Sequence, residues 1–238
     1  MDVNWLYSWP LWQAGIAFLV LLLLAAEIGF TLGARGHNLA SGDAKKTLRG
    51  DVTLGSMLAL LGLLLAFTYA FSLGRADMRK QAIVQEANAI GTAFLRADFV
   101  AQPERSELRH ALLEYARTRL VRDELIGEAQ QVAVQRSLEA QSRLWPATEQ
   151  ALREDVPGPL QALLVQAINE VLDAHAVRIS AVNDRIPGAV LALLLLVAGA
   201  SLALAAHNVG LNGSISRWRM ATFAAILAAL MLVIVDFD

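Results

Sequence analysis

The chain has 238 residues, of which 56% are hydrophobic and only 18% are charged. This composition is far more apolar than that of soluble globular proteins, so it excludes a freely soluble enzyme. The 20 Lys and Arg residues are balanced by 22 Asp and Glu residues, which leaves no basic surface for nucleic acid. The sequence has no cysteine, which excludes disulfides, thiolate metal sites and thiol nucleophiles.

Four apolar runs account for this composition, and together they contain a single charged residue, Glu27. The runs comprise residues 11–33, 52–74, 187–206 and 220–235. An α-helix needs roughly 20 residues to cross the ~30 Å core of a bilayer, and Trp218 and Arg219 extend the shorter fourth run to the interface. The sequence therefore predicts four transmembrane helices in a lipid bilayer.

Residues 75–186, between the second and third runs, are charged and contain no stretch apolar enough to cross a membrane. Ala, Leu, Glu, Arg and Gln dominate, and the few Pro and Gly residues separate predicted helices over 75–102, 104–124, 128–145, 147–155 and 159–186. The expected fold class is an all-α integral membrane protein with a helical extramembrane domain between spans two and three. We expect three parts along the chain. Residues 1–74 contain spans one and two, which are joined by a basic loop at 34–51. Residues 75–186 form the helical domain, and residues 187–238 contain spans three and four.

The first and last helices of this domain carry apolar residues at alternating spacings of three and four, which is typical of packing seams. The first seam is Ile83, Ala87, Ile90, Phe94 and Ala97, and the second is Val165, Ile168, Leu172, His175, Ile179, Val182 and Ile186. No loop signal separates either helix from its neighbouring span. We therefore expect span two to continue into the first helix, and the last helix to continue into span three, as an antiparallel pair.

Polar residues of these two helices fall at similar distances from the membrane when each residue contributes ~1.5 Å of rise. The expected polar network comprises Glu86, Asn88, Thr92, Asn169, Asp173, His175 and Arg178. A buried imidazole at His175 needs a hydrogen-bonding partner, and Glu86 and Asn88 lie at its level. The network either fixes the register of the helices or forms a pH-sensitive gate or ligand site.

Small residues recur along the second apolar run at helical spacing, next to two aromatic residues that could form a hydrophobic constriction. The set is Gly55, Ala59, Gly62, Ala66, Phe67 and Phe71. Small side chains let another helix approach closely, so this face indicates either helix packing or a pore-lining surface in an oligomer. Glu27 is either part of an ion pathway or a surface residue whose side chain reaches toward the neighbouring basic loop.

Basic residues of the short segments predict the orientation of the chain. They are Arg35, Lys45, Lys46 and Arg49 in one loop and Arg217 and Arg219 in the other, whereas neither tail contains Lys or Arg. By the positive-inside rule, both loops are cytoplasmic, and the termini and the helical domain lie on the non-cytoplasmic side.

Two longer blocks and the last residues carry a family resemblance. They read GLLLAFTYAFSLGRADMRKQAIVQEANAIGTAFLRA (62–97), INEVLDAHAVRISAVNDRIP (168–187) and VIVDFD (233–238). These blocks resemble the signatures of the bestrophin-like domain family, mainly bacterial membrane proteins of unknown function with a remote likeness to bestrophins, which are oligomeric chloride channels. The resemblance implies four spans with one large insert in a bacterial inner membrane. It favours a cytosolic insert, but we keep the opposite orientation because it follows from these residues.

The sequence contains no P-loop, Gly-x-Gly-x-x-Gly, Gly-x-Ser-x-Gly or His-Glu-x-x-His motif, so it names no catalytic residue, metal ligand or cofactor, and no enzyme is expected. We expect a homo-oligomeric membrane protein that acts as an ion channel or ion pathway. The alternative is a non-conducting sensor, scaffold or accessory subunit that binds a protein partner through its helical domain.

Overall fold

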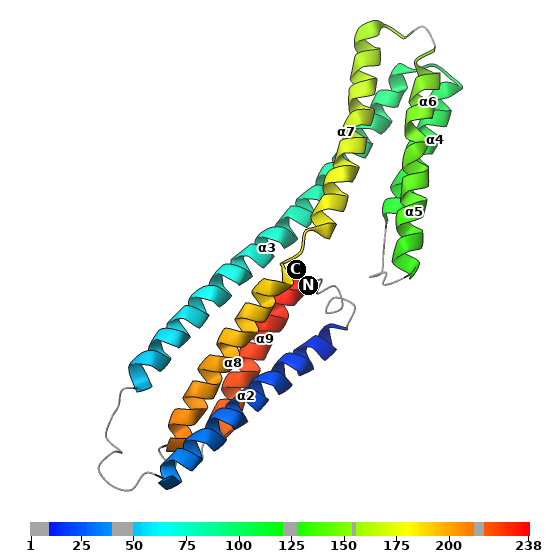
Figure 1. Ribbon diagram of the computed structural model, residues 1–238. Coiled ribbons are helices and arrows are strands. Elements are labelled where there is room, and N and C mark those ends of the chain that lie inside the picture. Colours follow the sequence, from blue (N-terminus) through cyan, green and yellow to red (C-terminus); the bar gives the residue numbers. More distant parts are fainter. Residues whose placement is uncertain (1–9, 40–49, 121–127, 154–155, 212–216) are drawn as a thin grey trace. The chain divides into compact units, whose positions relative to one another are not determined.

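The computed structural model describes residues 10–39, 50–120, 128–153, 156–211 and 217–238, and within these ranges the chain forms helices and no strand (Figure 1). The elements are α2 (Leu11–Leu39), α3 (Gly50–Arg96), the 3₁₀ helix η2 (Ala97–Phe99), α4 (Glu104–Arg119), α5 (Glu128–Ser142), α6 (Leu144–Ala151), α7 (Gly158–Asn183), α8 (Gly188–Leu211) and α9 (Arg217–Phe237). The all-α class is confirmed, and the four apolar runs lie in helices long and apolar enough to cross a membrane.

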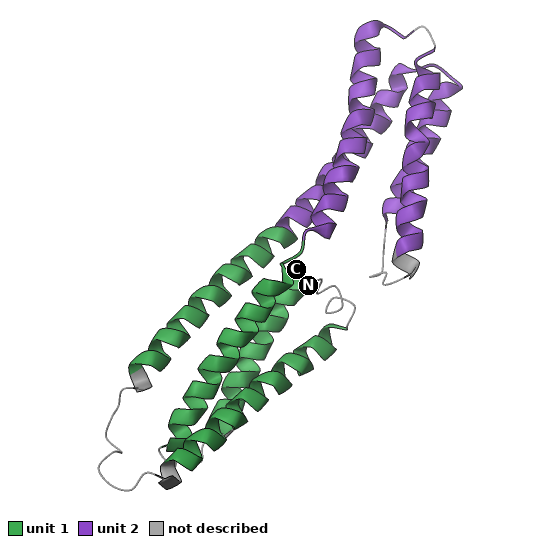
Figure 2. Cartoon of the chain, viewed as in Figure 1, with its two compact units in different colours: residues 1–76, 185–238 green, residues 77–184 purple. Residues whose placement is uncertain are grey.

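The chain divides into two compact units (Figure 2). Residues 1–76 and 185–238 form the first unit, which contains the apolar helices, and residues 77–184 form the second, which we call the helical unit. The helix α3 is a single helix of 47 residues, so the predicted continuation of the second apolar run into the following helix is confirmed.

The corresponding prediction for the other connection is wrong. The helix α7 ends at Asn183, Asp184 is extended with φ −78° and ψ 104°, and α8 begins only at Gly188. The cause is Pro187, which disfavours helical dihedral angles at the residue before it and has no N–H to continue the hydrogen-bond ladder. The break predicted at Pro146 is present but lies at Arg143, between α5 and α6. Pro146 itself lies in the first turn of α6, where its missing N–H needs no partner.

Close packing of α2 against α8 organises the apolar unit, and α9 also packs against α2. A Cβ atom at Gly29 would overlap the carbonyl oxygen of Ala203, and one at Gly33 would overlap that of His207. Glycine is therefore required where the two backbones meet, as is common between membrane helices. Around this contact the three helices bury an apolar core that includes Phe18, Leu22, Leu194, Leu202, Met231 and Ile234.

One end of the apolar part of α3 is tied to α9 and to the start of α8. The Ser72 hydroxyl donates to the carbonyl oxygen of Ile234 (2.6 Å), and Arg75 pairs with Asp238 (Nη1 to Oδ1, 3.2 Å). The fully buried Asp238 carboxylate also accepts hydrogen bonds from the backbone N–H of Ile186 (2.8 and 2.9 Å). A carboxylate at this position satisfies an N–H near the start of α8 and complements the helix dipole.

The helical unit packs α4, α5 and α6 against the antiparallel pair of α3 and α7. The direction of the pair follows from two contacts, Arg178 to Glu86 (2.6 Å) and Arg96 to the carbonyl oxygen of Leu163 (2.8 Å). The predicted seam of α7 is largely confirmed, since Ile168 and His175 are buried. The seam predicted at the end of the second run is right in part, because Ala97 in η2 is buried, and Ile90 and Phe94 are half-buried against the core. It is wrong at Ile83 and Ala87, which are exposed. The buried positions of α3 there are Ala82 and Glu86, one residue earlier, followed by Ala89 and Ala93.

We expect Gly29→Ala to destabilise the apolar unit because the added methyl group overlaps a backbone carbonyl that cannot move independently. The expected loss is roughly 2 kcal/mol or more, as for other overpacked cores, and it is measured as a lower melting temperature of the purified protein. The matched control is Gly199→Ala on α8, where the new Cβ would lie at an ordinary 3.7 Å from Ala25. Equal melting temperatures for the two variants would contradict the close contact at Gly29.

Candidate functional site

A buried carboxylate on α3 forms the centre of the helical unit. The Glu86 side chain is 1% exposed, and its Oε1 atom accepts hydrogen bonds from the Tyr115 hydroxyl (2.5 Å) and from Arg119 Nε (2.9 Å). Its Oε2 atom accepts from Arg178 Nη1 (2.6 Å). Glu86 lies beyond the apolar stretch of α3, and its partners come from α4 and α7. One carboxylate therefore joins three helices.

Hydrogen-bond chemistry fixes the tautomer of His175 beside this carboxylate. The single proton of the Tyr115 hydroxyl is donated to Glu86, so the Tyr115 oxygen can only accept from its other neighbour. That neighbour is His175 Nδ1, 3.0 Å away, which must therefore carry a proton. The result is a chain of donation from His175 to Tyr115 to Glu86.

Electrostatics hold the carboxylate in its ionised form. Burial alone would raise the pKa of Glu86, but its hydrogen-bonding and cationic neighbours outweigh this effect and lower the pKa from 4.5 to about 2. Burial, together with the Glu86 carboxylate, raises the pKa of Tyr115 far above its ordinary value, so the hydroxyl remains a neutral donor. We call Glu86, Tyr115, Arg119, His175 and Arg178 the Glu86 cluster.

A fourth helix joins the cluster through a single hydroxyl. Arg119, the last residue of α4, donates from Nη1 to the Ser137 Oγ atom on α5 (2.9 Å) while its Nε atom binds Glu86. A guanidinium group presents several donors in one plane, so one arginine can bind both helices. The cluster thus has the geometry to hold α3, α4, α5 and α7 in one register.

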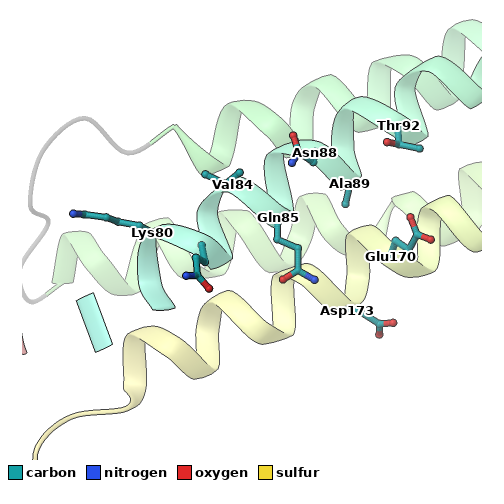
Figure 3. Close-up of a pocket in the computed structure, with 9 residues that line it drawn as sticks. Lys80, Val84, Gln85, Asn88, Ala89, Thr92, Glu170 and Asp173 are labelled. Atoms are coloured by element: carbon teal, nitrogen blue, oxygen red, sulfur yellow. The ribbon is translucent and has the colours of Figure 1, made fainter. Parts of the chain in front are cut away.

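The structure brings together three of the seven residues predicted for the polar network, namely Glu86, His175 and Arg178. The other four lie outside the cluster. Asn88, Thr92 and Asp173 line an open groove of about 740 Å³ between α3 and α7 (Figure 3), and Asn169 is exposed.

Three members of this site were missed in the sequence, namely Tyr115, Arg119 and Ser137. The sequence does contain a signal for Tyr115 and Arg119. They follow Leu108 and Leu112 on one face of α4, at spacings of four, three and four, which is the pattern of a buried helix face. A tyrosine on a buried face needs a partner for its hydroxyl. Nothing in the spacing of Ser137 indicates its role, since serine is common on exposed helix faces.

The predicted pore or packing face of α3 points away from the other helices of its unit. Gly55, Ala59, Gly62, Ala66, Phe67 and Phe71 are all exposed, and Phe67 and Phe71 are 57% and 69% exposed. A Cβ atom built at Gly55 or Gly62 would meet no heavy atom within 4 Å. Within the described chain these small residues therefore have no packing role.

The carboxylate inside the first apolar run lies on the surface of the apolar unit. Glu27 is exposed and borders a small pocket of about 150 Å³ whose other walls are apolar, including Phe30 on α2, Ala206 on α8 and Met220 on α9. Among the residues that the structure describes, no group of three or more His, Cys, Asp or Glu side chains could hold a metal ion.

Four apolar helices of spanning length, joined in one chain to a charged helical unit, define a multi-pass helical membrane protein. The family model of the Bestrophin-like domain matches residues 16–238, nearly the whole chain, and the chain belongs to this family. The resemblance of the sequence blocks is thereby confirmed. No curated protein and no solved structure matches the chain.

We expect Glu86→Gln to destabilise the helical unit, because the amide leaves two guanidinium groups without their carboxylate. At pH 7 the free energy of unfolding should fall by roughly 3 kcal/mol. The folded pKa of about 2 lies below the unfolded value of 4.5, so this stabilisation is complete above pH 4.5 and is lost as the pH falls toward 2. Denaturant unfolding followed by circular dichroism measures the difference between wild type and variant, which should vanish near pH 2.

The control for this prediction is Glu107→Gln, which neutralises an exposed carboxylate on α4. Its effect should stay within about 0.5 kcal/mol, as for most surface substitutions. A difference between wild type and Glu86→Gln that does not change between pH 7 and pH 2 would show that the charge of Glu86 contributes nothing to stability.

Proposed function

We propose that this protein assembles in a membrane as a homo-oligomer and provides a pathway for ions. Membership of the Bestrophin-like family supports a relationship to ion channels. The observation that carries the proposal is the unpartnered outer face of α3, where small residues lie exposed along the apolar run and no side chain of the described chain approaches Gly55 or Gly62.

The composition of this face favours a protein neighbour over lipid. Lipid chains cover large apolar side chains as well as protein does, whereas small residues gain most from the close approach of another helix. In a closed ring of subunits the same face lies near the symmetry axis, and the exposed Phe67 and Phe71 then supply a hydrophobic constriction. The interface and the ion pathway are thus parts of one assembly.

We place the helical unit outside the membrane, because its core is organised around ionised groups. Glu86, Arg119 and Arg178 form ion pairs there, and charged side chains are costly within hydrocarbon. The predicted orientation, with this unit and the termini on the non-cytoplasmic side of a bacterial inner membrane, rests on the basic residues near the opposite ends of the spans. Lys45, Lys46 and Arg49 lie outside the described residues. No catalytic role is part of the proposal.

The second candidate, a non-conducting sensor, scaffold or accessory subunit, differs from the first in a measurable way. It binds a protein partner through the helical unit and needs no central opening. The open polar groove between α3 and α7 supplies a surface for such a partner. Purified protein in lipid nanodiscs gives the number of subunits by mass, and reconstituted bilayers give the current, so one preparation distinguishes the two functions.

We expect wild-type protein to form a ring of three or more subunits and to conduct ions, and Gly62→Val to weaken both properties together. Valine adds bulk at a helix contact, and overpacking of about 1–3 kcal/mol corresponds to association weakened roughly 5- to 150-fold. The fold of the subunit should be retained because the position is open within the chain. Mass measurement in nanodiscs and bilayer currents test the two effects.

The matched control is Leu60→Val, an exposed apolar position on a different side of α3. Its oligomeric state and current should equal those of the wild type. A stable oligomer without any current would favour the scaffold function, and a monomer that conducts would contradict the role given to this face of α3.

A further inference from the structure

The groove between α3 and α7 of the helical unit has opposite charges at its two ends (Figure 3). Lys80 lies at one end, and Glu170 and Asp173 lie toward the other. All three side chains are exposed and form no ion pair with a described residue, although Glu170 accepts a hydrogen bond from Gln166 (3.0 Å). The volume of about 740 Å³ is within the usual range for ligand-binding clefts. The groove therefore suits a ligand that carries both charges.

The distance between these charges follows from the register of the two helices. Hydrogen bonds from Arg178 and from Arg96 join α3 and α7, and they bracket Asp173 and Glu170 along α7. Interpolation between them places the two carboxylates about nine to eleven residues of α3 from Lys80. At ~1.5 Å per residue, the opposite charges are about 14 to 16 Å apart along the groove.

Uncharged polar side chains of α3 line the groove between its charged ends. Gln81, Gln85, Asn88 and Thr92, which we call the polar stripe, follow one face of the helix at spacings of four, three and four. Their side chains form no hydrogen bond with a described residue. Each of the three amides carries a donor and an acceptor, as a peptide bond does. The polar stripe can therefore bind main-chain N–H and C=O groups, whatever the sequence of the ligand.

An extended polypeptide matches the length and the spacing of the polar stripe. From Gln81 to Thr92 the helix rises about 16 Å, in steps of about 4.5 to 6 Å. An extended chain covers this length with about five residues, and every second residue, about 6.6 Å apart, presents its main-chain groups on the same side. Val84, which is 58% exposed, adds an apolar contact in the same groove.

Charged residues that flank the groove on α3 do not line it. Asp77 and Arg79 precede Lys80, and Arg96 lies one turn beyond Thr92, where its guanidinium group donates to a carbonyl oxygen of α7. Among the described residues, a ligand in the groove therefore meets one cation and two carboxylates.

We infer that the groove binds an extended segment of a partner protein. The main chain of the segment lies along the polar stripe, a basic side chain faces Glu170 and Asp173, and an acidic side chain four residues away faces Lys80. Four residues of extended chain span about 13 Å, and the long charged side chains cover the remaining distance. In this mode of recognition, main-chain contacts supply affinity and the charged ends supply specificity. The inference is independent of the ion pathway, and it gives a chemistry to the partner that the second candidate function needs.

A small set of peptides tests this groove. Each is a capped chain of nine residues built from Ala, Ser and Thr. Two positions, four apart, carry Lys and Glu in either order, two Lys, two Glu or two Gln. Fluorescence anisotropy with the whole chain in nanodiscs measures the binding of each labelled peptide. We expect one order of Lys and Glu to bind most tightly, and added salt to reduce this preference because exposed charges are screened.

Two kinds of substitution separate the charged ends from the polar stripe. Asp173→Asn combined with Glu170→Gln should weaken binding of the preferred peptide about fivefold, as expected for exposed ion pairs, and should abolish its advantage. Gln85→Met, which keeps the size of the side chain but removes the amide, should weaken all the peptides by a similar factor. The control Glu107→Gln, on α4 outside the groove, should bind as the wild type does. Circular dichroism reports the fold of each variant.

Equal or absent binding of all the peptides would overturn the inference and leave the ion pathway standing, because currents are measured separately. A preference that survives the loss of both carboxylates would also overturn it. Dissociation of the oligomer on addition of the preferred peptide would show that a second copy, rather than a partner protein, occupies the groove.

Discussion

The buried Glu86 carboxylate is the constraint on which the helical unit depends. A charge enclosed by protein must be compensated, and here two arginines and a tyrosine hydroxyl supply the compensation from α4 and α7. Because these partners are fixed to two other helices, α4 and α7, the register of one helix cannot change without exposing an unpaired charge. The alanines on the buried face of α3 add to this arrangement, since they allow the long partner side chains to reach the carboxylate.

The apolar unit uses a different interaction for the same purpose. Backbones of α2 and α8 meet where Gly29 and Gly33 carry no side chain, so these two helices pack tightly on each other. The helix α3 contributes Leu61 and Leu65 to the apolar core and is tied at one end by Ser72 and by the ion pair of Arg75 with Asp238. Its outer face is left free for a neighbour, which is why the proposed assembly and the proposed ion pathway share this helix.

The family match and the structure support different parts of the proposal. The family match supports the proposed relationship to ion channels, whereas the exposed small residues of α3 supply a surface for the proposed association.

Sequence alone determined the four apolar spans, the continuous α3 and the similar level of His175 with Glu86 and Asn88, because hydrophobic length and helical rise are local properties. It did not determine which stripe of α3 is buried, since the predicted stripe through Ile83 and the buried stripe through Ala82 are only one residue, or about 100°, apart around the helix, and only the partners of Glu86 decide between them. The break after Asn183 and the arrival of Tyr115, Arg119 and Ser137 from distant helices were decided by the tertiary structure. These features depend on contacts between residues far apart in the chain, which no spacing within one helix can specify.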